Sequence, residues 1–156
     1  MPQTLEPLLR DHAFFAGLEP GYLALIVGCA ANEVYPADAF LFREGEPAQT
    51  FYLIREGKVA LEVAAPGRGA LVVQTLGEGD VVGFSWLIAP HRWEFDGRAV
   101  EPVRALRMDG TCLRAKFDDD PRLGYELMRR FAGLTVNRLQ ATRLQLLDVY
   151  GRAHDH

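Results

Sequence analysis

The stretch VVGFSWLIAPHRW, residues 81–93, is the most informative part of this sequence. Two valines lead into Gly83, a dense run of apolar and aromatic residues follows, and Pro90 marks a loop. Aromatic residues on short strands usually belong to a core, so the stretch predicts a glycine turn and a loop beside an apolar interior.

Short segments rich in β-branched and aromatic residues flank this stretch on both sides. They span residues 40–42, 51–54, 59–63, 71–76 and 103–106. Turns that contain glycine separate them, and this spacing is typical of an all-β sandwich or roll. The turn REGK at 55–58 predicts a hairpin between the second and third segments, with Gly57 at a positive φ.

Helical patterns lie at both ends of the chain. The first zone, residues 5–31, is expected to be helical, with a buried helix over 22–27. Near the C-terminus, a short helix is predicted at 113–117. The motif DDDP at 118–121 then predicts a helix start, because an Asp cap and a Pro in the first turn both favour one, and this helix is expected to reach about Val149.

The long final helix carries two stripes. The first contains Leu127, Phe131, Leu134 and Arg138, and the second contains Met128, Ala132, Thr135, Leu139, Thr142, Leu146 and Val149. One stripe can pack on the roll. The second has a spacing of three and four residues, which favours pairing of the helix with a second copy of the chain. The alternative is that both stripes pack within one monomer.

Length and composition indicate one globular domain of 156 residues with 49% hydrophobic residues. Its expected parts are a helical lead-in at 1–31, a β roll at 32–109 that includes 81–93, and C-terminal helices at 110–150. The net charge of -4 argues against a dedicated nucleic-acid binder. With no signal peptide and no apolar run of membrane-spanning length, a cytoplasmic protein without membrane contact is expected.

Catalysis and metal binding have little support in the sequence. Hydrolase, metalloprotease and P-loop motifs are absent, and a helix start explains the three aspartates of DDDP. No histidine has a ligand-type partner nearby, so neither an enzyme nor a metal site is expected. Cys29 and Cys112 lie in apolar surroundings without CxxC spacing, and we expect reduced thiols.

The ordered set of segments resembles the cyclic-nucleotide-binding domain family over nearly the whole chain. The residues that carry the resemblance are LFREGEPA (41–48), FYLIREGKV (51–59), LGEGDVVG (76–83) and EPVRALRM (101–108). The resemblance implies a fold that is mainly β with α: a β jelly roll with N-terminal helices, a short helix and a long C-terminal helix. Residues 81–93 then look like the phosphate-binding cassette, which implies cAMP or cGMP as the ligand.

Near the C-terminus, RLQAT (138–142) and LDVYGR (147–152) resemble the dimer helix and hinge of catabolite-activator-type regulators. The candidate dimer-helix residues, taken from the second stripe of the final helix, are Met128, Thr135, Leu139, Thr142 and Leu146. A helix-turn-helix domain follows in those regulators. This chain stops before one, so we expect no DNA partner and an output through contacts with an unknown protein partner.

The cassette departs from the family's pattern at its polar positions. In the family, a glutamate after the cassette glycine holds the ribose 2′-OH, but Phe84 stands there in this chain. A buried hydroxyl left unpaired costs about 1–3 kcal/mol. The family's phosphate-binding arginine precedes a small residue. Arg92 is near that position but precedes Trp93, whereas Arg98 precedes Ala99 but aligns better with a later strand.

The candidate ligand-binding residues are therefore Gly83, Phe84, Ser85, Trp86, Arg92, Trp93 and Arg98. Their aromatic rings could stack on a planar ligand, while Ser85 and nearby backbone amides hold an anion. In the structural alternative, the aromatics are core, Arg92 is a surface residue and Arg98 pairs with Glu94 or Asp96.

Three functions follow from these readings. The first is a regulatory sensor with an altered pocket that takes a small non-standard ligand. The second is a ligand-free scaffold whose aromatics fill the pocket. The third is a fragment of a cAMP- or cGMP-responsive transcription regulator.

Overall fold

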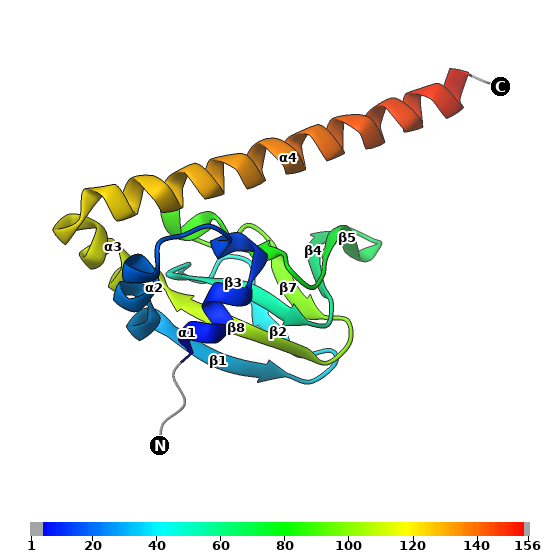
Figure 1. Cartoon of the computed structure of the whole chain (residues 1–156). Coiled ribbons are helices and arrows are strands. Elements are labelled where there is room, and N and C mark those ends of the chain that lie inside the picture. Colours follow the sequence, from blue (N-terminus) through cyan, green and yellow to red (C-terminus); the bar gives the residue numbers. More distant parts are fainter. Residues whose placement is uncertain (1–4, 155–156) are drawn as a thin grey trace.

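Two antiparallel four-stranded sheets form the roll at the centre of the molecule (Figure 1). The computed structural model describes the backbone of residues 5–154 and, within that range, the side chains of 5–144 and 146–148. One sheet has the strand order β1-β8-β3-β6 and the other β2-β7-β4-β5. The strands are β1 (Ala30–Tyr35), β2 (Phe40–Phe42), β3 (Thr50–Glu56), β4 (Val59–Ala65), β5 (Gly69–Leu76), β6 (Val81–Val82), β7 (Asp96–Ala99) and β8 (Val103–Asp109). The predicted mainly-β jelly roll with flanking helices is confirmed.

All five predicted strand segments lie in strands, but three further strands were missed. Strand β1 begins at Ala30, inside the predicted helical lead-in, because its sequence AANEVY lacks a clear apolar alternation. Strands β6 and β7 are too short to carry a period of their own. Strands this short depend on their neighbours for pairing, so local sequence does not reveal them.

The predicted hairpin at 55–58 is wrong, because β3 and β4 belong to different sheets. The turn instead carries the chain from one sheet to the other. Gly57 does have a positive φ, of 93°, and a Cβ there would lie 2.3 Å from the carbonyl oxygen of Pro102. A glycine is needed at this position because the crossing packs directly on the turn before β8.

Helices cover one side of the roll. They are α1 (Glu6–Asp11), η1 (Ala13–Phe15), α2 (Pro20–Ile26), η2 (Val27–Cys29), η3 (Ser85–Leu87), α3 (Gly110–Asp119) and α4 (Pro121–His154). The DDDP motif acts as predicted, because the Asp120 side chain accepts a hydrogen bond from the Leu123 amide as α4 begins. Helix α4 runs past the predicted end at Val149, to His154. None of the described helices combines the length and apolarity needed to cross a bilayer.

The buried apolar residues form two clusters on opposite faces of the sheet that contains β3. We call the first the helix-side core: Leu9, Phe14, Phe15, Leu18, Leu23, Ile26, Cys29, Phe51, Leu53, Val81, Trp86, Leu106, Met108, Leu113, Leu123, Leu127 and Phe131. The second is the roll core: Leu41, Phe42, Ala48, Tyr52, Ile54, Val59, Leu61, Leu76, Val82, Trp93, Ala99, Val103 and Ala105. Successive residues of β3 alternate between the two, as the period of a strand requires.

Cys29 and Cys112 are joined by a disulfide, which corrects the expectation of reduced thiols. The bond links η2 to α3 across a separation of 83 residues, with the two Cα atoms 5.6 Å apart. Apolar surroundings were the basis of the wrong prediction. They are also the physical reason for the pairing, because both residues pack in the helix-side core and so meet there.

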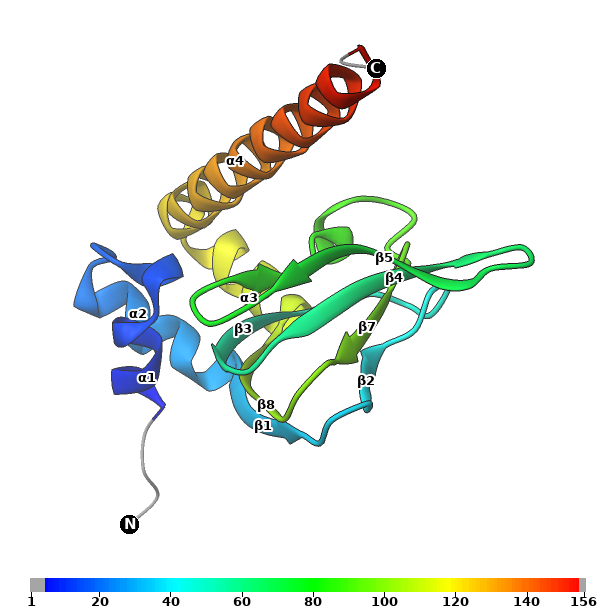
Figure 2. The ribbon, with the colours of Figure 1, turned by 90° about the vertical axis from the view of Figure 1, so that its right-hand side faces the viewer.

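Helix α4 has a packed half and a projecting half. Leu127 and Phe131 are buried in the helix-side core, and the Arg130 guanidinium donates to the carbonyl oxygens of Phe14 and Ala16. Beyond them the helix runs past the roll, as Figures 1 and 2 show. The second stripe is exposed there, with Leu139 at 50% and Leu146 at 54%. Packing of both stripes within one monomer is therefore wrong, while Val149 lies outside the described side chains.

Candidate ligand-binding site

Gly83 directly follows β6 and has a conformation that only glycine adopts readily. Its φ is 108°, and a Cβ at this position would lie 2.7 Å from Cη2 of Trp93. The backbone of the cassette can therefore lie directly against an indole ring. This contact fixes the turn from which η3, Ser85–Leu87, departs.

Trp86 faces away from the roll and into the helix-side core. Its ring stacks on Phe51 with centroids 5.1 Å apart and covers Gly110, where a Cβ would lie 2.6 Å from the indole. Arg114 of α3 donates to its carbonyl oxygen at 2.9 Å. The prediction that Trp86 contacts a ligand is thereby corrected. Successive residues of a 3₁₀ turn point about a third of a turn apart, so Trp86 and Ser85 face different sides.

Trp93 lies in the roll core, where it stacks on Phe42. The two rings are almost parallel, with centroids 3.7 Å apart. Phe42 in turn covers Gly97, where a Cβ would lie 2.6 Å from its ring. Two glycines, Gly83 and Gly97, thus leave room for one aromatic stack that occupies much of the interior of the roll.

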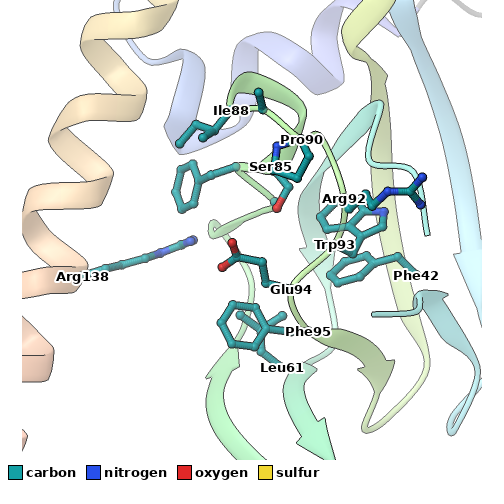
Figure 3. A pocket seen from close by; sticks show the side chains of 13 residues that line it. Phe42, Leu61, Ser85, Ile88, Pro90, Arg92, Trp93, Glu94, Phe95 and Arg138 are labelled. Carbon is teal, nitrogen blue, oxygen red and sulfur yellow. The ribbon is translucent and has the colours of Figure 1, made fainter. Parts of the chain in front are cut away.

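A cavity of about 180 Å³ remains beside this stack, between the cassette and α4 (Figure 3). Its lining residues are Phe42, Leu61, Gly83, Phe84, Ser85, Ile88, Ala89, Pro90, Arg92, Trp93, Glu94, Phe95 and Arg138. Most of the wall is aromatic or aliphatic. Figure 3 shows Ser85, Glu94 and Arg138 pointing toward one another across it. The volume is below the range of about 300–1,000 Å³ typical of pockets for drug-sized ligands.

Arg138, like Glu94, is not among the ligand-binding residues predicted from the sequence. It comes from α4, lies with its guanidinium carbon 4.7 Å from the centroid of the Phe84 ring, and donates to the carbonyl oxygen of Val81. Burial lowers the pKa of this guanidinium, against the nearby charge of Asp80, but an arginine stays protonated in proteins. The sequence feature that could have identified Arg138 as a cavity residue is its position, since it continues the apolar stripe of Leu127, Phe131 and Leu134.

The two arginines that were selected have other roles. Arg92 is exposed and donates to the carbonyl oxygen of Gly45 at 2.8 Å; Figure 3 shows its guanidinium pointing away from Arg138. Arg98, on β7, does not line the cavity, which corrects its prediction as a ligand contact. The structural alternative of an ion pair is right in kind, but its partners are Glu62 at 2.7 Å and Asp38 at 2.9 Å.

The partners of Arg98 follow from strand pairing. Strand β7 lies between β2 and β4, with Arg98 opposite Ala60 and Asp96 opposite Glu62. A long side chain on one strand reaches the residue diagonally across on the next, so Arg98 meets Glu62 rather than Glu94 or Asp96. Elsewhere among the described residues, no three His, Cys, Asp or Glu side chains gather into a group that could hold a metal ion.

Comparison with known proteins agrees with this fold. Residues 32–120 match the family model of the cyclic nucleotide-binding domain. The chain belongs to this family. It is 28% identical over 145 residues to a CRP-like cAMP-activated global transcriptional regulator of Mycobacterium tuberculosis, covering 93% of this chain and 63% of that protein. The chain thus spans less than two thirds of the length of that relative.

Other family members extend the likeness. Human cGMP-dependent protein kinase 2 is 27% identical over 133 residues, which are 83% of this chain and 17% of the kinase. A putative cyclic nucleotide-binding protein from Geobacter metallireducens has a solved structure with a TM-score of 0.76 and 29% identity, covering 89% of this chain and 99% of that one. The catabolite activator protein of Thermus thermophilus superposes with a TM-score of 0.68 at 25% identity, over 86% of this chain and 61% of that one.

The polar groups of this cavity differ from the set that the family resemblance implies. Phe84 follows the cassette glycine, where the resemblance implies a glutamate, and its ring packs under Arg138. Arg92 and Arg98 are both held by other protein groups. The polar side chains that face the cavity are instead Ser85, Glu94 and Arg138.

Proposed function

We propose that this protein is a ligand-responsive regulatory module in which the roll cavity controls the long helix α4. The observation that carries the proposal is the position of Arg138, which belongs to α4 and forms part of the cavity wall. Any molecule that enters the cavity meets this side chain. The same helix exposes an apolar stripe, so a change at Arg138 can reach a surface suited to protein contacts.

The fixed and free parts of α4 favour this mechanism. The packed half is held by Leu127, Phe131 and the hydrogen bonds of Arg130. Leu134 also packs against the helix-side core, and beyond it Arg138 attaches the helix to the Phe84 ring and the Val81 carbonyl. A ligand that draws the guanidinium away from these groups would alter the projecting half of α4 and leave the packed half in place.

The proposed partner of that half is a second copy of the chain. Leu139 and Leu146 are about half exposed, and they follow Thr135 and Thr142 at the spacing of a helix pair. Met128, which is partly buried, begins this stripe. The net charge of -4 disfavours DNA as a partner, so the proposed output is a protein contact rather than catalysis or direct DNA binding.

Hydrogen exchange measured along α4 tests the proposal without any ligand. Replacement Arg138→Gln removes the cavity attachment, and we expect faster amide exchange from about residue 132 to 144 but unchanged exchange at 121–131. The matched control is Arg143→Gln, an exposed arginine of the same helix, which should leave both regions as in the wild type. Equal exchange in the wild type and Arg138→Gln would contradict the proposal.

Sedimentation velocity tests the proposed dimer separately. The wild type should sediment as a dimer, and a monomer at all concentrations would contradict the proposed pairing of α4 with a second copy.

A ligand-free scaffold is the second candidate, and the stack of Phe42 on Trp93 favours it. These rings fill interior space that a larger ligand would need. They do not close the site, since the cavity of about 180 Å³ lies beside them. The two candidates differ in whether that remaining cavity takes a small molecule.

A further inference from the structure

We infer that the cavity selects a small organic anion with a flat apolar body, namely an aromatic or heteroaromatic monocarboxylate. This inference deepens the proposed function and rests on its premise that the cavity is a ligand site. Three features carry it: the size of the cavity, the chemistry of its walls and the charges of the side chains that meet inside it.

The size of the cavity fits one ring with a small substituent. Its volume is about 180 Å³. An engineered apolar cavity of about 150 Å³ in another protein binds benzene, whereas pockets for drug-sized ligands begin at about 300 Å³. A single aromatic ring that carries a carboxylate therefore matches the space, and an intact nucleotide requires the stack of Phe42 on Trp93 to open.

The walls favour a flat and apolar ligand body. Four aromatic side chains line the cavity: Phe42, Phe84, Trp93 and Phe95. Leu61, Ile88 and Pro90 add aliphatic surface. Aromatic rings gain from edge-to-face and offset-stacked contacts beyond the burial of their area, so an aromatic body gains more here than a saturated body of similar size.

Arg138 supplies the charge that an anion requires. Its guanidinium has five N–H donors, and in the described structure one protein acceptor, the Val81 carbonyl, takes a hydrogen bond from it. No carboxylate of the described residues lies within ion-pair distance of Arg138. A carboxylate would accept two parallel hydrogen bonds from this fork, which are among the strongest that proteins form.

Ser85 and Glu94 narrow the choice of anion. The Ser85 hydroxyl points into the cavity and offers a further donor to a carboxylate oxygen (Figure 3). Glu94 points toward the same space and brings one negative charge. Its charge repels anions, and it repels a dianion such as phosphate about twice as strongly as a monocarboxylate. Because Glu94 is exposed, it can turn toward solvent when a monoanion enters.

Titration calorimetry with a matched series of compounds tests each feature separately. Benzoate carries both the ring and the charge, benzamide lacks the charge, cyclohexanecarboxylate lacks the flat ring, and inorganic phosphate lacks the apolar body. We expect benzoate to bind, with benzamide and phosphate weaker by about tenfold or more, and cyclohexanecarboxylate in between. No binding of benzoate, or equal binding of benzamide, would overturn the inference.

Variants assign the effect to the cavity. Arg138→Gln should weaken benzoate binding by about tenfold or more, while Arg143→Gln, on the exposed face of the same helix, should leave it unchanged. Glu94→Gln should act in the opposite direction and strengthen it by a few fold. Loss of folding cannot strengthen binding. Glu94→Gln therefore still tests the inference if Arg138→Gln proves unstable. Unchanged affinity in both Arg138→Gln and Glu94→Gln would contradict the inference.

Two further compounds separate this inference from the proposed function. Binding of cAMP or cGMP in place of benzoate would refute the ligand class and leave the regulatory module standing. If no compound binds but Arg138→Gln still changes exchange along α4, the ligand class also fails and the link between cavity and helix stands. If no compound binds and exchange along α4 does not change, both fail and the scaffold is favoured.

Discussion

Trp86 and Trp93 belong to one short segment of sequence, yet they lie in different cores and in different kinds of environment. Trp86 is fully buried among Phe51, Phe131 and Gly110 in the helix-side core, and within the described structure its Nε1 has no hydrogen-bond partner. Trp93 packs on Phe42 in the roll core and lines the cavity. The comparison shows that the cassette connects a closed region, continuous with the helices, to an open region beside the candidate site.

This difference assigns separate tasks to the two ends of the cassette. The Trp86 end is fixed to α3 by Arg114 and by close packing on Gly110, so it joins the cassette firmly to the helices. The Trp93 end sets how much of the interior remains empty. If this division holds, a substitution at the Trp86 end should mainly lower the free energy of unfolding. A substitution at the Trp93 end should mainly change the candidate ligand site.

Truncation of the two tryptophans is expected to give the largest effect. Trp86→Ala leaves a sealed cavity in the helix-side core and should lower the free energy of unfolding by about 4 kcal/mol. Trp93→Ala enlarges a cavity that already has polar groups and room for water, so about 2 kcal/mol is expected. Urea denaturation followed by circular dichroism measures both. Equal losses of stability in Trp86→Ala and Trp93→Ala would contradict the proposed difference between the two ends of the cassette.

Removal of the disulfide, which lies in the helix-side core, is expected to give the next largest effect on stability. The double variant Cys29→Ala/Cys112→Ala releases a link between residues 83 apart and should lower the free energy of unfolding by about 3 kcal/mol. The unfolded chain gains entropy when such a long loop is opened. Reducing agent should destabilise the wild type by a similar amount and leave the double variant unchanged. A wild type that is insensitive to reductant would contradict the assignment.

The same comparison explains which features could be predicted from sequence. The apolar strands, the glycine turns and the DDDP helix start are local signals, and they located five strands, α3 and α4. The partners of Cys29, Arg98 and Arg138 are distant in sequence, so no local pattern reveals them. Resemblance to the family directed attention to residues 81–93, several of which line the cavity. It did not identify the cation of the cavity, because that cation comes from α4 rather than from the cassette.

His12 lies at the junction of the two cores, and we expect it to give the smallest effect. Its Nδ1 accepts a hydrogen bond from the Phe14 amide and caps η1, while Nε2 lies 3.1 Å from the carbonyl oxygen of Ile54 in the roll core. An acceptor nitrogen on one side and a donor on the other require the neutral ring. Burial accordingly lowers the pKa of His12 below its usual 6.5, although the Ile54 carbonyl and the charge of Asp80 oppose the shift.

The sign of the pH dependence follows from that lowered pKa. Below about pH 6.5 the unfolded chain binds a proton at His12 more readily than the folded one. The stability that neutral His12 provides is therefore present above this pH and is lost as the pH falls through the folded pKa. His12→Asn retains a capping acceptor but cannot titrate, so its free energy of unfolding should fall less between pH 7 and pH 5. Parallel pH curves for the wild type and this variant would contradict the prediction, because they would show that His12 does not contribute to the pH dependence of stability.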